Sequence, residues 1–284
     1  MSSSVLIWLA GAVVVAVTGG VLTVRAGRRP AVTGGAVDRA DRVRRHLVDD
    51  LGPAGAALGV GAALAALTFA VGWPLGRLAH AVEAAVDVPV FDWFNARQES
   101  GGFDSLQDVL TQMGNRPEIK VVAIVAAIVL AVAWRRRWWV PVLVLLAAFF
   151  VEKYVQAGLA RVVDRGHPPT TNGTWPSGGC ARLVSMYGTV LWLIFRTWRV
   201  APRVRGTLWT LLAVAAWMEG FARTYRLEHW VTDVVGGWVV GVLLLGAFVA
   251  TAATLASPRR PAGAPAAASA EGADGRRPEA VQPV

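Results

Sequence analysis

The chain has 284 residues, of which 55% are hydrophobic, and its mean hydropathy is +0.47. This composition excludes an ordinary soluble domain and predicts an all-α helical bundle that crosses a membrane several times. The net charge of +9 comes from 26 arginines and two lysines, which cluster between apolar segments. We therefore attribute the charge to membrane topology and expect membrane lipids, and no nucleic acid, as partners. One cysteine, Cys180, excludes an intrachain disulfide, and we expect neither a cofactor nor a metal site.

Seven apolar segments are predicted to be membrane spans, because each approaches the length that a helix needs to cross a bilayer. They are Val5–Val24, Pro53–Leu78, Ile119–Trp134, Pro141–Leu159, Cys180–Phe195, Thr207–Phe221 and Val234–Leu255. A signal peptide is the alternative for the first segment. No basic residues precede that segment and arginines follow it directly, which favours a membrane anchor.

Clusters of arginine predict the orientation of these spans. The clusters lie at 25–45, 135–137, 196–205 and 259–260, and they alternate as expected if each faces the cytoplasm. Residues 161–179 and 223–233 then lie together on the non-cytoplasmic face. Within the fourth span, we expect Glu152 and Lys153 to form a mutual ion pair.

Three regions follow from this pattern. Residues 1–52 form an N-terminal membrane anchor and a charged cytoplasmic segment, and residues 53–256 form the main membrane domain. Residues 257–284 are rich in alanine, proline, glycine and charge, which predicts a disordered cytoplasmic tail.

A polar stretch between the last two spans carries the most specific pattern in the sequence. Arg223 precedes His229 by six residues, and Asp233 follows that histidine by four. On a helix that begins after Leu227, the histidine and the aspartate share a face. The carboxylate can then hold the imidazole Nδ1–H and leave Nε2 free as a nucleophile, while the arginine binds an anion. The alternative is a local pair that only caps a helix end.

A second polar stretch precedes the fifth span. It contains Arg161, Arg165 and His167, followed by the sequence Pro176-Ser177-Gly178-Gly179. A serine-glycine-glycine turn at a helix N-terminus presents free amides to an anion, although it is also an ordinary N-cap sequence. Together the two stretches are typical of a phosphoryl-transfer site in which arginines carry the charge.

These residues resemble the signatures of the type 2 phosphatidic acid phosphatase (PAP2) superfamily of membrane lipid phosphatases. That family carries Lys-x6-Arg-Pro, Pro-Ser-Gly-His and Ser-Arg-x5-His-x3-Asp on a six-helix core. The resemblance covers about Pro53 to Leu255 and makes Val5–Val24 an added N-terminal transmembrane helix. Arg223, His229 and Asp233 match the third signature, with Ala222 where serine is usual.

The other two signatures depart from the family pattern. Pro176, Ser177 and Gly178 match the second one, but Gly179 stands where the family has the histidine that protonates the leaving group. In the first signature, His167-Pro168 align with Arg-Pro and Ala160 with the lysine. Arg161 or Lys153 can substitute for that lysine, and Arg165 matches an arginine that is common in bacterial members.

The resemblance implies a metal-independent phosphatase that acts on a lipid phosphate through a phosphohistidine on His229, in the cell membrane. Its substrate class is phosphatidate, phosphatidylglycerol phosphate or polyprenyl (di)phosphate. Asp233 would fix the histidine tautomer. The phosphoryl oxygens would be held by Arg223, Arg161, Arg165 and the turn Ser177, Gly178 and Gly179. The alternatives are a lipid phosphotransferase, a non-catalytic relative that binds lipid phosphates, and a transporter.

His167 has two interpretations, because Gly179 cannot supply a proton. It lies in the loop that leads to the second signature, so it can replace the absent imidazole as the acid that protonates the leaving oxygen. It can also simply replace an arginine as a phosphate ligand.

Overall fold

The secondary structure is helical throughout the part of the chain that the computed structural model describes, which is residues 3–26, 34–98, 102–171 and 173–257. This agrees with the predicted all-α class. The elements in chain order are α1 (Ser3–Ala26), α2 (Gly34–Ala81), η1 (Glu83–Asp87), α3 (Val88–Asn95), α4 (Gly102–Gln112), α5 (Arg116–Trp134), η2 (Arg135–Arg137), α6 (Trp139–Val163), α7 (Gly178–Arg182), η3 (Leu183–Tyr187), α8 (Gly188–Thr197), α9 (Pro202–Tyr225) and α10 (Val231–Leu255).

Five helical segments in the described ranges are long and apolar enough to cross a membrane, so the chain is a multi-pass membrane protein. They are Asp38–Ala81, Arg116–Arg137, Trp139–Val163, Gly178–Thr197 and Val231–Leu255. The first and sixth predicted spans are helical, as α1 and α9, but they are not among these five. The exposed faces are apolar, as a lipid environment requires: Ile128 and Val132 on α5 are 60% and 71% exposed.

The boundary predicted between residues 52 and 53 coincides with a kink in α2. Gly52 has φ 71° and ψ 166°, outside the helical region, and Pro53 follows it. A positive φ is readily available to glycine, and proline lacks the N–H that an uninterrupted helix would need there. The charged segment before the kink is therefore set at an angle to the apolar segment that follows it.

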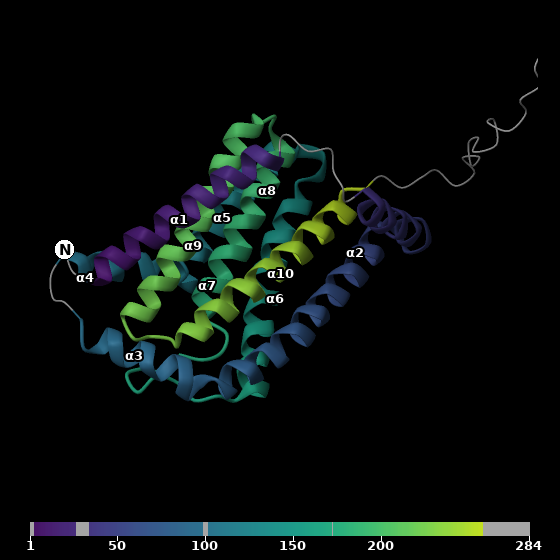
Figure 1. Ribbon diagram of the computed structural model, residues 1–284. Coiled ribbons are helices and arrows are strands. Elements are labelled where there is room, and N and C mark those ends of the chain that lie inside the picture. Colours follow the sequence, from purple (N-terminus) through teal and green to yellow (C-terminus); the bar gives the residue numbers. More distant parts are fainter. Residues whose placement is uncertain (1–2, 27–33, 99–101, 172, 258–284) are drawn as a thin grey trace, which may run out of the picture.

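The two ends of the helix bundle differ in character. At one end, Arg44 on α2 donates to the Ala253 carbonyl and to the Ser257 hydroxyl, and Arg137 donates to the Ala256 carbonyl. Two of the predicted arginine clusters thus meet the C-terminal end of α10. The connection from α6 to α7 and the connection from α9 to α10 lie together at the opposite end (Figure 1). The predicted tail, apart from Ser257, lies outside the described residues.

Helix α10 lies between α9 and α2 (Figure 1). Val240, Leu244 and Ala252 on this helix are completely buried. Gly236 and Gly237, one turn from its N-terminus, lie against Trp175 and Ser177, and a Cβ at either glycine would overlap these neighbours. The absence of side chains there lets the start of α7 pack directly on α10.

The polar stretch predicted between the second and third spans folds into η1, α3 and α4. Its aromatic side chains pack on the C-terminal end of α9, where Phe94 contacts Phe221 at 5.5 Å and Phe103 contacts Tyr225 at 5.1 Å between ring centroids. This packing fixes the turn that links α4 to α5, which forms one wall of the candidate site.

Candidate active site

His229 and Asp233 lie at the junction of α9 and α10. The imidazole Nδ1 is 3.5 Å from the Asp233 Oδ2, as the spacing of four residues predicts. The local structure differs from the prediction, because α10 begins at Val231 and His229 precedes it. Asp233 occupies the first turn of the helix and also accepts a bond of 3.3 Å from the Trp230 amide. The carboxylate is fully buried, whereas the imidazole is 11% exposed and lines a polar cavity.

Arg165 does not face that cavity. Its guanidinium is fully buried behind Asp233, with Nη1 3.3 Å from the Asp233 Oδ1. Nη2 lies 2.7 Å from the Asp87 Oδ2 and 3.2 Å from the Glu83 Oε2. Arg165, which was predicted to bind phosphate, is thus surrounded by three carboxylates. One of them is Asp233, the aspartate that lies against His229.

Asp87 connects this buried cluster to the first turn of α10. Its Oδ1 accepts a bond of 2.9 Å from the Thr232 amide, and its Oδ2 accepts one of 2.7 Å from the Thr232 hydroxyl. The Thr232 hydroxyl also accepts a bond of 2.7 Å from the Arg165 Nη1. The last turn before α3 therefore fixes the start of the helix that carries Asp233.

We expect Asp87→Ala to destabilise the fold strongly. Removing one partner of a buried ion pair typically costs about 3–5 kcal/mol, because the remaining charge stays desolvated. Thermal unfolding in detergent measures the effect, with the exposed Asp50→Ala as the matched control. Equal unfolding temperatures for the two variants would contradict the assignment of Asp87 to the buried cluster.

The Pro-Ser-Gly-Gly turn docks on the same helix start. The Ser177 amide donates a bond of 2.9 Å to the Asp233 carbonyl. Gly178 and Gly179 begin the continuous helical segment Gly178–Thr197 and line the cavity. Two parts of the sequence 56 residues apart are therefore joined by backbone contact, and the glycines that open this helical segment line the same cavity as His229.

Arg223 lines the same cavity, but most of its hydrogen-bonding capacity is used within the protein. Its Nε donates to the Glu219 Oε1 at 2.8 Å, and its Nη1 donates to the Glu228 Oε2 at 2.9 Å. Nη2 donates to the Thr111 carbonyl at 2.8 Å and to the Asn115 Oδ1 at 2.9 Å. A guanidinium has five N–H donors, so one remains for a ligand.

The position of Arg223 explains the glycine at position 179. A Cβ there would overlap the Arg223 guanidinium, which the four bonds above hold in place. The family histidine cannot be restored at this position without displacing Arg223. Gly114 lies on the other side, where a Cβ would overlap both the Glu219 carboxylate and the Gly179 carbonyl.

The cavity has a volume of about 380 Å³ and contains two further arginines that sequence reasoning missed. Arg116 is exposed at the start of α5. Arg182, one turn into the segment that begins at Gly178, donates from Nε to the Gly114 carbonyl at 2.8 Å. The complete lining is Asn115, Arg116, Pro117, Glu118, Gln156, Gly173, Thr174, Gly178, Gly179, Arg182, Arg223 and His229.

The prediction that Glu152 pairs with Lys153 is wrong. Glu152 is buried, and its Oε1 lies 3.4 Å from the Arg182 Nη1. Lys153 instead lies over the Tyr154 ring, 5.5 Å from its centroid. Consecutive residues on a helix point in different directions, which separates the two side chains. Glu152 therefore orients a cavity arginine from behind.

Arg161 and His167 are not brought into the cavity. Both residues are exposed, and neither lines the cavity. The His167 Nδ1 is 2.9 Å from the Pro168 carbonyl, so it is engaged within its own loop. This loop is attached to the His229 loop further along, where Thr170 and Thr171 donate to the Leu227 and Glu228 carbonyls, both at 2.7 Å.

The missed arginines leave only faint signals in the sequence. Arg182 is a charged residue inside a predicted span, which by itself indicates a functional position. Arg116 is followed by Pro117, an Arg-Pro pair outside the region where the family pattern places one. Among the residues that the structure describes, no group of three His, Cys, Asp or Glu side chains could hold a metal ion.

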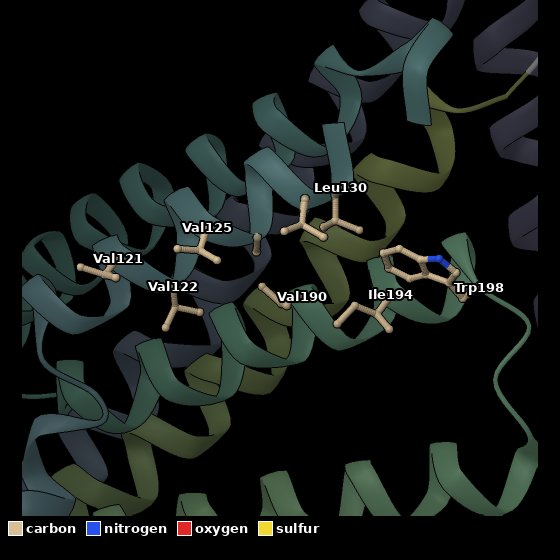
Figure 2. Close-up of a pocket in the computed structure, with 9 residues that line it drawn as sticks. Val121, Val122, Val125, Leu130, Val190, Ile194 and Trp198 are labelled. Carbon is tan, nitrogen blue, oxygen red and sulfur yellow. The ribbon is translucent and has the colours of Figure 1, made fainter. Parts of the chain in front are cut away.

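An apolar cavity of about 510 Å³ lies between α5 and α8 (Figure 2). Val121 and Val122 line one end of it, one helical turn beyond Glu118, and Ile194 and Trp198 line the other end. An apolar surface therefore begins on the same helix whose first turn lines the polar cavity.

The fold and the cavity define a multi-pass helical membrane protein with a cationic site suited to an anion. The sequence profile of the PAP2 superfamily matches residues 168–256. The "first transmembrane PAP2 type phosphatidylglycerolphosphate phosphatase from Bacillus subtilis" has a similar crystal structure, with a TM-score of 0.57 and 19% identity, over 65% of this chain and 93% of that chain. No curated protein matches the chain at a significant level. Residues 168–256 are thus similar to the PAP2 superfamily, and the chain shares the fold of that phosphatase.

Proposed function

We propose that the protein is a membrane lipid-phosphate phosphatase of the phosphatidate, phosphatidylglycerol phosphate or polyprenyl (di)phosphate class. The observation that carries the proposal is the shared cavity of His229 and three arginines, Arg116, Arg182 and Arg223. A histidine with one nitrogen against a buried carboxylate is oriented as a nucleophile, and clustered guanidinium groups bind phosphate.

In the proposed reaction, the His229 Nε2 attacks phosphorus while the bond from phosphorus to the alcohol oxygen breaks. Asp233, whose Oδ2 lies 3.5 Å from the Nδ1, stabilises the charge that the ring acquires. Arg165 acts behind it as a positioning residue. Water then attacks the phosphohistidine and releases phosphate, or an alcohol attacks it and the protein is a phosphotransferase.

The phosphoryl oxygens would lie against the amides of Gly178 and Gly179 and the side chains of Arg116, Arg182 and Arg223. This set differs from the one predicted from the sequence, because Arg161 is exposed outside the cavity and Arg165 is enclosed by carboxylates. The apolar cavity between α5 and α8 is suited to the lipid tail, since it begins one turn beyond the polar cavity.

A second candidate is a protein that binds lipid phosphates without turning them over. Two observations favour it: Gly179 lacks the family imidazole, and Arg223 spends four of its five donors on protein groups. The close contact of His229 with Asp233 favours the phosphatase, because anion binding alone does not require an oriented nucleophile.

Purified protein in detergent with a panel of lipid phosphates tests the proposal. We expect phosphate release from at least one member of the panel. Saturable binding of those lipids with no release above that of a His229→Ala protein would favour the binding protein instead.

We further propose that the cavity faces the non-cytoplasmic side. The support is the arginine clusters, since Arg44 and Arg137 lie at the opposite end of the bundle from His229. Single cysteines at Thr171 and Ala266 in a Cys180→Ser background test the orientation on intact cells. We expect a membrane-impermeant thiol reagent to label position 171 and not position 266, and the reverse pattern would contradict the orientation.

A further inference from the structure

Position 179 has no side chain, and neither does the residue that packs against it. Gly114 lies so close to Gly179 that a Cβ on it would overlap the Gly179 carbonyl. The turn between α4 and α5 therefore closes directly over the start of α7. The Gly114 carbonyl, which accepts from the Arg182 Nε at 2.8 Å, fixes this contact.

The same turn brings a carboxyl group into the cavity. Glu118 is four residues after Gly114, in the first turn of α5, and it lines the cavity together with Gly179 and His229. Its Oε2 is buried without a hydrogen-bond partner. No ion pair involves Glu118 among the residues that the structure describes, although three arginines line the same cavity.

The other acids near the cavity each pair with an arginine, although the Glu219 Oε2, like the Glu118 Oε2, is buried without a hydrogen-bond partner. Glu152 pairs with Arg182, and Glu219 pairs with Arg223. Glu228 contacts two arginines, at 2.9 Å and 3.6 Å. None of these three lines the cavity, so Glu118 is the acid of the described chain that does. An unpaired buried carboxyl oxygen is costly, and such groups concentrate at functional sites.

We propose that Glu118 is the general acid that replaces the missing family histidine. This proposal rests on the proposed phosphatase function. As the His229 Nε2 bonds to phosphorus and the bond to the leaving oxygen breaks, the Glu118 carboxyl group gives a proton to that oxygen and the lipid alcohol departs neutral. Water then attacks the phosphohistidine and releases phosphate, and the Glu118 carboxylate regains its proton from solvent before the next turnover.

The dependence on leaving group tests this role. A positioned acid contributes about 10²–10⁴-fold when the leaving group is a poor one. We expect Glu118→Gln to lose at least about 10²-fold in kcat with an alkyl lipid phosphate and to keep near wild-type kcat with p-nitrophenyl phosphate, whose leaving group needs little protonation. Glu118→Asp should recover part of the alkyl activity, and the exposed Asp92→Asn is the matched control.

Two results would overturn the assignment. An equal loss of kcat with both substrates would make Glu118 a residue that shapes the site, and unchanged kcat with both would make it a residue that only stabilises the start of α5. Failure of the underlying function is distinguishable, because it would show as wild-type protein with no release above His229→Ala with either substrate.

Discussion

Replacing His229 by alanine is expected to abolish phosphate release from any lipid phosphate that the protein hydrolyses. The imidazole is the nucleophile in the proposed reaction, and loss of a nucleophile removes the covalent route altogether, at a cost of several orders of magnitude in kcat. The side chain is 11% exposed at the cavity wall, so the variant should fold. Phosphate release and thermal unfolding in detergent, measured on the same preparation, separate the two effects.

His46→Ala is the matched control, because His46 is exposed on the charged part of α2. It should release phosphate as the wild-type protein does. Wild-type turnover by His229→Ala, with whatever substrate, would show that His229 takes no part in the reaction.

Arg182→Ala should produce the second largest loss. Arg182 lines the cavity one turn beyond Gly179, and both the Gly114 carbonyl and Glu152 orient it. A preorganised donor to a phosphoryl group acts mainly in the transition state, and its removal typically costs about 10²–10³-fold in kcat. Steady-state kinetics should therefore show a fall in kcat that exceeds any rise in KM.

Arg199→Ala serves as the control, since Arg199 is exposed and lies outside the cavity. Arg182→Lys should recover little, because an ammonium group cannot reproduce the guanidinium fork. A rise in KM with unchanged kcat for Arg182→Ala would limit this arginine to ground-state binding.

Much of the fold could be predicted from the sequence, because the bilayer determines the length of the apolar segments and the side on which arginines cluster. The helical class and the meeting of residues 161–179 with 223–233 at one end of the bundle both follow from them. The turn of α4 into α5 could not be predicted, since its position depends on the absence of side chains at Gly114 and Gly179.

The candidate site could be predicted in part. The contact between His229 and Asp233 could be predicted from their spacing, because residues four positions apart also come close together across a helix N-terminus. Arg165 was expected to face phosphate, yet Asp87 and Glu83, about 80 residues earlier, enclose it. No local sequence pattern could reveal that these two carboxylates lie beside Arg165.

The missed arginines show the same limit. Arg116 and Arg182 reach the cavity from the start of α5 and from the segment after Gly179, and neither belongs to a signature. Their role depends on how three helix ends converge, which only the folded chain reveals.

Trapping the covalent intermediate tests the central claim most directly. A lipid phosphate that carries a radiolabel in the phosphoryl group is mixed with the protein and quenched in alkali, where phosphohistidine is stable. The account predicts a label on the peptide that contains His229, lost on brief treatment with acid and absent from His229→Ala. Labelled phosphate released at the wild-type rate by protein in which His229 never carries label would contradict it.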